Sequence, residues 1–519
     1  MSFFSKAHDL VVNNSTFNAV TGNQTNVHYN ENEKGTTIFT HQMEHTSYFP
    51  SGLALLWQTL APVGAFHDSE ARFPPPKCHP ETRKAVLKDL SAWIRQEMPV
   101  PDINQRFISP APLDPPFSRF SRTAAELQTP IHWLYGPAGA GKSAIAQTLS
   151  ERFDISSGGQ RLAASFFFSR LSPTRNNPRF LFTTIAYCLA VWGGDPDLRN
   201  AIDKAVQMPH SVLAASIEVQ FRKLLVEPLQ KLSQESWEKL PKAVVIDGLD
   251  ESQGSASQKR VLKMILDQVW QPLGDGIPRF LRFLIASRPE PAIRDIFNQS
   301  QYRNLTTRTE LSDNYSTSAD IAKYLRDRFA HIAEEYGEIP ADVPLPWPSE
   351  GVIQELVQRA SGQFIYATTV LKYVEDEYSL PWERLKCVLG LPVGDPEAFS
   401  DLDILYRQIM SSNPNKALLL RVLGTRLALI TAPFETIRLI EYLLYLPAGT
   451  VSVTLRGMHS VLQITTNDFG FLHKSSQDFL NDSRRSKEYF IDIPATHEHL
   501  SRRCLEIVSM ADFDCSQSE

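Results

Sequence analysis

The sequence predicts an α/β fold with a five-stranded, mostly parallel sheet covered by helices on both faces, followed by a mainly helical second half. Three observations predict it. Short apolar or β-rich runs alternate with helical stretches, as in strands joined by crossover helices. A glycine-rich string follows the first run and opens a helix. Beyond Asp313, helical patterns dominate, for example over residues 319–337, 351–377 and 401–410. The five expected strands are residues 131–135, 162–168, 243–246, 282–286 and 302–307.

Composition indicates a folded protein and disfavours two kinds of partner. Of the 519 residues, 42% are hydrophobic and 21% are charged, which is ordinary for globular domains. A net charge of −6 gives no general attraction to nucleic acid, so we expect no nucleic-acid partner. The five cysteines are widely spaced, which fits a reducing compartment. The most apolar stretch, residues 52–66, is too short to cross a bilayer, and we read no secretory signal. We therefore expect a cytoplasmic protein without a membrane span.

Changes in composition predict six regions. The first is rich in Asn and Thr and has two interpretations: a strand-pairing or self-assembly segment, or a polar disordered leader. Proline-rich runs at residues 74–80 and 109–117 flank a helical pattern. No repeat with a solenoid or propeller period is present. The regions are a polar leader at 1–50, a helical segment with proline-rich linkers at 51–123, the α/β core at 124–312, a helical domain at 313–400, a further domain at 401–490, and a C-terminal helix and tail at 491–519.

The glycine-rich string GPAGAGKS predicts a phosphate-binding loop. It satisfies the pattern G-x-x-x-x-G-K-[ST], follows an expected strand and opens the helical stretch SAIAQTLSERF. Backbone N–H groups of such a loop surround phosphate oxygens, Lys142 reaches the β- and γ-phosphates, and the Ser143 hydroxyl binds Mg²⁺. The nucleotide-binding residues are predicted to be Gly136, Pro137, Ala138, Gly139, Ala140, Gly141, Lys142, Ser143 and Ala144.

The run KAVVIDGLDE predicts the acids of the same site. Four apolar residues, typical of a buried strand, end in three carboxylates. Asp247 at the strand tip would hold Mg²⁺ through water, and Asp250 or Glu251 would polarise the attacking water. An acidic strand end is by itself more often a solvated turn. Downstream of a phosphate-binding loop, with one strand between, the functional interpretation is favoured.

The run FLIASRPE adds two candidate catalytic residues. Ser287 and Arg288 follow a further apolar strand, at the edge where open α/β sheets bind ligands. Either side chain could sense the γ-phosphate. The alternative is an ordinary loop whose arginine pairs with a surface carboxylate.

Together, GPAGAGKS, VVIDGLDE and IASRPE resemble the NACHT class of signal-transducing P-loop NTPases, in particular those of fungi. The segments CHPETR, AASFFFSR, TTIAYCLA and LDILYRQI extend the resemblance over roughly residues 65–485. The resemblance implies ATP and ADP with Mg²⁺ as cofactors and slow ATP hydrolysis. It also implies that residues 401–490 form a winged-helix-like domain.

The run FGFLHKSSQDFL is similar to the winged-helix motif whose histidine contacts the ADP β-phosphate in NOD-like receptors, which makes His473 the candidate ADP latch. The family motif has an aromatic residue where Ser476 stands here. A lone histidine is otherwise more often a satisfied polar residue. Relatives often place a proline against the adenine in the helical domain, where this chain has Gly362, Gln363 and Phe364. Relatives also continue into ligand-recognising repeats, and we expect none within this sequence.

The favoured interpretation is a switch that ADP holds closed and ATP opens, so that the chain assembles with itself or with related NACHT proteins. Three alternatives stay open: an adaptor or modulator of full-length NACHT receptors, a P-loop kinase, and an origin-binding ATPase. A kinase needs a lid with clustered arginines, and an origin-binding protein needs a basic wing; neither pattern is evident in the sequence. ATP is favoured over GTP by the resemblance alone.

Overall fold

The computed structural model describes residues 51–96, 129–154, 161–170, 172–207, 212–270, 281–311, 317–337, 340, 343, 345–375, 379–392, 400–429 and 436–516. The predicted leader at 1–50, the proline-rich run at 109–117 and the expected start of the core near Ala124 lie outside these residues. Within the described residues, no helix combines the length and apolar composition needed to cross a membrane.

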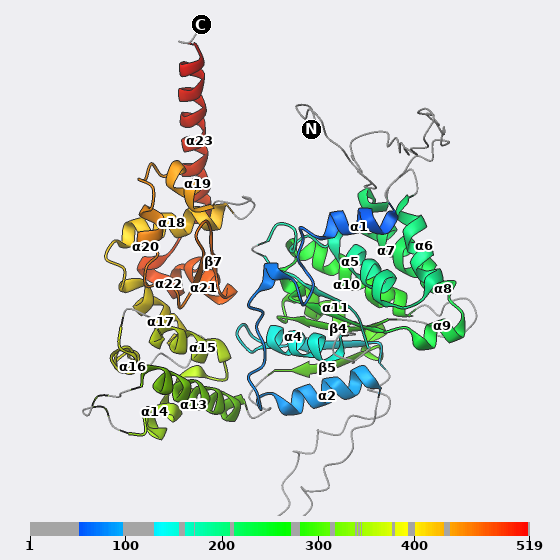
Figure 1. The fold of residues 1–519 in the computed structure, drawn as a ribbon, viewed down its shortest axis with the longest axis horizontal. Helices are drawn as coiled ribbons and strands as arrows, with labels where there is room; N and C mark the ends of the chain where they lie inside the picture. The colour runs from blue at the N-terminus through cyan, green and yellow to red at the C-terminus, as the bar shows by residue number, and fades with distance from the viewer. Residues whose placement is uncertain are drawn as a thin grey trace, which may run out of the picture. The chain divides into compact units, whose positions relative to one another are not determined.

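The core is a five-stranded parallel sheet with the strand order β2-β3-β4-β1-β5. Figure 1 labels β4 and β5 of this sheet. Strands that are not neighbours in sequence therefore pair, and the carboxyl ends of β1, β3 and β4 lie at one edge of the sheet. The strands are β1 (Ile131–Tyr135), β2 (Leu162–Phe167), β3 (Ala243–Asp247), β4 (Arg282–Ser287) and β5 (Thr306–Glu310).

Alternate residues of the strands face two separate apolar layers. Trp133 and Val244 pack on one face of the sheet, whereas Leu134 and Val245 pack on the other. The first face is covered by α5 (Arg179–Trp192), α10 (Gly254–Trp270) and α11 (Pro291–Phe297). The second is covered by α2 (Lys84–Arg95) and α4 (Lys142–Phe153). The predicted fold class, with helices on both faces, is confirmed.

Further short elements complete the α/β core. They are α1 (Gly52–Leu60), η1 (Glu70–Arg72), α6 (Pro196–Gln207), η3 (Val212–Ala214), α7 (Ile217–Phe221), η4 (Arg222–Val226), α8 (Glu227–Gln230), α9 (Gln234–Lys239), η5 (Leu249–Glu251) and α12 (Ser300–Arg303).

The remainder is mostly helical, with one continuous apolar core from α13 to the start of α23. Helices α18, α19 and α20 precede the antiparallel hairpin β6–β7. We call residues 462–480, which include this hairpin and α21, the wing. The elements are α13 (Thr317–Tyr336), α14 (Glu350–Ala360), α15 (Phe364–Val374), α16 (Pro381–Leu389), α17 (Ser400–Ser411), α18 (Lys416–Ala428), α19 (Thr436–Leu443), α20 (Thr450–Thr454), β6 (Leu462–Ile464), β7 (Phe469–Phe471), α21 (Lys474–Leu480), α22 (Ser483–Ser486), η7 (Lys487–Tyr489) and α23 (Ile493–Ser516).

Two local predictions differ from the structure. The fifth strand was expected at residues 302–307, but α12 ends at Arg303 and the strand begins at Thr306. This strand is polar, and its pairing with β1, which is invisible in local sequence, decides its position. The helical stretch at 351–377 is two helices, because Ser361 and Gly362 adopt left-handed φ values of 45° and 75°.

Trp93 provides a test of the second apolar layer. Its side chain is fully buried, and its indole Nε1 donates a hydrogen bond to the Thr129 carbonyl at 3.1 Å. We expect Trp93→Ala to lower the free energy of unfolding by about 3–5 kcal/mol, because a large cavity remains and the hydrogen bond from the indole is lost. Urea titration followed by circular dichroism measures the loss. Tyr442→Ala, at a side chain that is 60% exposed, is the control and should change the value by less than about 0.5 kcal/mol. Equal effects of the two substitutions would contradict this packing.

Candidate functional site

The predicted phosphate-binding loop lies between the end of β1 and the start of α4. Gly141 has a φ of 90° and directly precedes α4, and Gly139 has a φ of 74°. A side chain at either position would be strained. At Gly139 there is also no room, because a Cβ would lie 2.2 Å from the Cγ2 of Ile365 on α15. The glycines therefore serve both the curvature of the loop and its close contact with α15. The core has the P-loop NTPase fold.

Lys142 lies inside the loop. Its Nζ donates hydrogen bonds to the carbonyls of Gly136 at 2.9 Å and Pro137 at 2.7 Å. Burial lowers the pKa of Lys142 to about 8, although Asp250 and Asp247 act in the opposite direction. The ammonium group is thus held at the place where a P-loop lysine meets phosphate oxygens.

Asp247 ends β3 and is 5% exposed. Burial raises its pKa to about 6, while a hydrogen bond with the Ser143 side chain and the charges of Arg72 and Lys142 lower it. Among the described residues, no group of three or more His, Cys, Asp or Glu is arranged to hold a metal ion. Mg²⁺ commonly takes one or two carboxylates together with substrate phosphates. Asp247 and Ser143 fit that donor set.

Asp250 and Glu251 lie in the short 3₁₀ helix η5 after Gly248 and have different surroundings. Burial alone would raise the pKa of Asp250, but Lys474, Lys142 and Arg288 lower it below its ordinary value. The Glu251 carboxylate accepts a hydrogen bond from the Arg170 backbone N–H at 3.1 Å. Burial and the nearby Asp250 nevertheless raise the pKa of Glu251. A raised pKa suits a general base, so Glu251 is the better candidate of the two.

Only one of the two residues predicted after β4 reaches the cavity. Ser287 is fully buried, and its Oγ accepts a hydrogen bond from the Trp133 indole at 2.9 Å, within the layer between the sheet and α11. Ser287 is not among the residues that line the cavity, whereas Arg288 is. The prediction of Ser287 as a sensor is therefore not supported by its position. Ser287 is the last residue of β4, whereas Arg288 lies in the loop that follows the strand.

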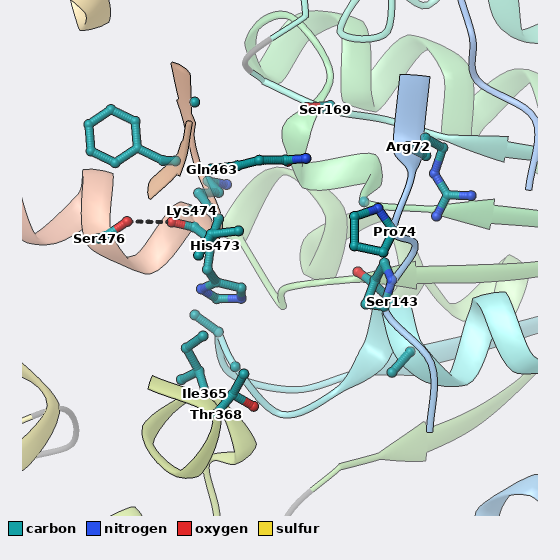
Figure 2. A pocket seen from close by; sticks show the side chains of 18 of the residues that line it. Arg72, Pro74, Ser143, Ser169, Ile365, Thr368, Gln463, His473, Lys474 and Ser476 are labelled. Carbon is teal, nitrogen blue, oxygen red and sulfur yellow. Dashed lines mark hydrogen bonds between the residues drawn. The ribbon is translucent and has the colours of Figure 1, made fainter. Parts of the chain in front are cut away.

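His473 lies at the amino end of α21 and lines the same cavity as the P-loop (Figure 2). Its Nδ1 accepts a hydrogen bond from the Ser475 backbone N–H at 3.0 Å. Burial, followed by the charges of Arg288 and Lys142, lowers the pKa of His473 to about 3. The ring is therefore neutral near pH 7 and carries its proton on Nε2. That N–H is the group that can donate to a ligand in the cavity.

The cavity has a volume of about 870 Å³ and is lined by many parts of the chain. They include the segment from Glu70 to Arg83, the P-loop, the end of β2, the acidic turn at residues 247–251, Arg288, α15 and the wing. Nucleotide-sized ligands occupy pockets of roughly 300–1,000 Å³. Most of the predicted site residues line this one cavity, whereas four of them do not: Gly136, Pro137, Ala140 and Ser287.

Arg72 and Arg83 also belong to this site, although the sequence does not mark them as site residues. The Arg72 guanidinium lies 3.5 Å from the centre of the Phe167 ring and donates to Gln147 Oε1 at 2.7 Å. Arg83 donates to the carbonyl of Ala140 in the P-loop at 2.8 Å. The run CHPETR was noted only as part of a family resemblance, and nothing local to Arg72 signals its role.

Residues 117–288, less than half of the chain, match the family model described as Nephrocystin 3, N-terminal. No curated protein matches the sequence.

Of the 49 solved chains that match, one is a signal transduction ATPase with numerous domains (STAND) from Pyrococcus horikoshii, with a tetratricopeptide repeat sensor. It has 12% identity and a TM-score of 0.38, and the match covers 73% of this chain and 43% of that one. The ORC2 protein of Aeropyrum pernix matches in its ADPNP–ADP complexes with 12% identity and a TM-score of 0.31, over 86% of this chain and 100% of that one. Its ADP form has 13% identity and a TM-score of 0.31, over 72% and 88%. Because all three scores are below 0.5, the fold assignment rests on the strand order and the P-loop geometry.

The raised pKa of Asp247 gives a pH test of the candidate Mg²⁺ site. Mg²⁺ binds the ionised carboxylate, so protonation competes with the metal below pH 6. We expect the Mg²⁺ affinity of the ADP-bound protein to be constant above about pH 7 and to fall about tenfold for each pH unit below the pKa. Calorimetric titration with MgCl₂ at pH 5 to 8 measures this. Asp247→Asn, which cannot ionise, should bind Mg²⁺ weakly at every pH. A wild-type affinity that does not change down to pH 5 would exclude Asp247 as the titrating ligand.

Proposed function

We propose that the protein is an ATP/ADP-binding switch of the NACHT type. One observation carries the proposal: the P-loop, the acidic turn and His473 line the same cavity, although His473 is more than 300 residues from the P-loop in sequence. A nucleotide bound to the loop would therefore face the wing as well. A ligand that contacts two separate parts of a chain stabilises the arrangement that keeps them together.

The His473 side chain has the chemistry that an ADP latch requires. A neutral imidazole with its proton on Nε2 donates one hydrogen bond and brings no charge of its own. Its hydrogen bonds with Ser475 fix the ring, and the Ser475 Oγ in turn lies 2.7 Å from the Tyr406 hydroxyl. The donor is thus preorganised by α17 and α21, so little ordering cost remains when a phosphate binds.

The finer terms of the proposal follow from the same site. ADP would favour the arrangement with the wing on the cavity, and exchange for ATP would release it and allow assembly with further copies or related NACHT proteins. Mg²⁺ would be held by Ser143, Asp247 and phosphate oxygens. Lys142 would meet the β- and γ-phosphates, and Glu251 would orient water. Hydrolysis would be slow and would serve to reset the switch.

The first test is the nucleotide that the purified protein retains. After denaturation, chromatography identifies and quantifies it in wild type, Lys142→Ala and His473→Ala. We expect ADP in wild type and almost none in Lys142→Ala, because the phosphate charge loses its partner. In His473→Ala we expect about tenfold weaker ADP binding, the loss of one hydrogen bond to a charged group. His459→Ala, at an exposed histidine near the wing, is the control and should retain ADP.

Two results would decide against the proposal. No nucleotide in wild type, together with no binding of added ATP or ADP, would leave a P-loop fold without nucleotide function. Equal ADP retention by His473→Ala and His459→Ala would show that His473 is not the ADP latch, although the nucleotide site itself would stand.

A further inference from the structure

Two ion pairs of opposite polarity connect α21 of the wing to the loops that follow β3 and β4. Lys474 Nζ lies 3.2 Å from Asp250 Oδ2. Arg288 donates from Nη1 to Asp478 Oδ2 at 2.7 Å. The helix thus supplies the cation of one pair and the anion of the other. Each core partner is a residue that the sequence placed at the γ-phosphate end of the nucleotide site.

The first pair is almost completely buried, and the second is partly buried. The side chains of Lys474 and Asp250 are 8% and 3% exposed, and those of Arg288 and Asp478 are 22% and 28% exposed. Buried pairs are screened little by salt, and removing one partner leaves an uncompensated charge. Within each pair, the loss of one partner is therefore far more costly than in an exposed pair. In Lys386–Glu383, for example, the side chains are 62% and 58% exposed.

The pairs also occupy Asp250 and Arg288, two of the residues that the sequence predicts to be catalytic. Asp250 accepts from the Arg288 backbone N–H at 3.0 Å through Oδ1 and from Lys474 through Oδ2. Both carboxylate oxygens are thus engaged. The Arg288 guanidinium is directed to Asp478, with its Nε 3.6 Å from Asp250. While α21 is docked, neither residue is free to act on a γ-phosphate or on an attacking water.

The four residues can also pair in a second way that leaves none of their charges uncompensated. Lys474 and Asp478 are four residues apart on one helix, so their side chains lie on the same face and can pair with each other. Arg288 and Asp250 are already close enough to pair within the core. Lysine four residues before an acid is the weaker orientation of a helical pair, which favours the docked arrangement. Such an exchange of partners gives two discrete states.

We propose that Lys474 and Asp478 form a double latch that exchanges partners. While α21 is docked, they pair with Asp250 and Arg288 and keep both from acting on a nucleotide. When α21 leaves, Asp250 and Arg288 pair with each other. The inference rests on the proposed function, since it names how the same nucleotide site is regulated. It differs from the His473 contact, because it needs no nucleotide to hold the wing.

The most informative variant, the inverted variant, exchanges the two charged residues of α21 without changing its composition. The double substitution Lys474→Asp/Asp478→Lys keeps the net charge and keeps a pair on the helix, but it places like charges against Asp250 and Arg288. Lys474→Met and Asp478→Asn remove one contact each, Lys474→Arg preserves the charge, and Lys386→Met is the control for losing an exposed lysine pair. Thermal melting of each variant checks that it is folded.

The readout is the rate at which a fluorescent N-methylanthraniloyl ADP is released when excess ATP is added. We expect Lys474→Met and Asp478→Asn to release it about tenfold faster than wild type, and the inverted variant faster still. Lys474→Arg and Lys386→Met should stay within twofold of wild type. Unchanged release from the inverted variant, with ADP still bound, would overturn the latch and leave the proposed function intact.

A second measurement needs no nucleotide. Amide hydrogen exchange of α21 in the nucleotide-free protein should be at least tenfold faster in the inverted variant than in wild type, with Lys386→Met unchanged. If the protein binds no nucleotide at all, the proposed function fails, and this exchange still decides whether the two pairs hold the wing. Equal exchange in wild type and the inverted variant would overturn the latch.

Discussion

The ion pair between Lys474 and Asp250 joins the wing to the acidic turn with both side chains almost fully buried. Charges without water must be compensated by neighbours, and this requirement governs the whole carboxyl edge of the sheet. Lys142 is held by loop carbonyls, and Arg288 is shared between two acids. Glu251 accepts the Arg170 backbone N–H. The charges of Lys142, Asp250, Glu251 and Arg288 therefore act on one another across this edge.

The cavity wall is assembled from segments that are far apart in sequence. The stretch before α2 crosses from the core to α13: the Cys78 backbone N–H donates to Thr148 on α4, and His79 pairs with Asp327 on α13. Gln463 of the wing donates to the Phe73 carbonyl of this stretch. Ile365 on α15 packs directly against Gly139 of the P-loop. Contacts of this kind couple the nucleotide site to the helical parts through packing as well as through charge.

Sequence patterns were most informative where local chemistry and local geometry coincide. A buried parallel strand is a short apolar run, so β1 to β4 were found within one residue of their ends. The strand β5 is polar and is defined by its partner β1, so its position was missed by several residues. The break at Ser361 and Gly362 was also missed, because the apolar spacing of two consecutive helices resembles one longer helix. Arg72 and Lys474 had no local signal, since their importance comes only from what they contact.

By itself, the sequence determined the P-loop, the acids after the third strand and the order of strands and helices along the chain. These features depend on glycine conformations, hydrophobic periodicity and residue spacing, which are properties of consecutive residues. Tertiary structure decided which of Ser287 and Arg288 reaches the cavity, and that Lys474 and Asp478 both contact the core. It also decided that Asp250 is paired with a cation and that the pKa of Glu251 is raised. The physical reason is that burial and electrostatic interaction depend on distances in space between side chains, and those distances are set only when the sheet, α15 and the wing pack around one cavity.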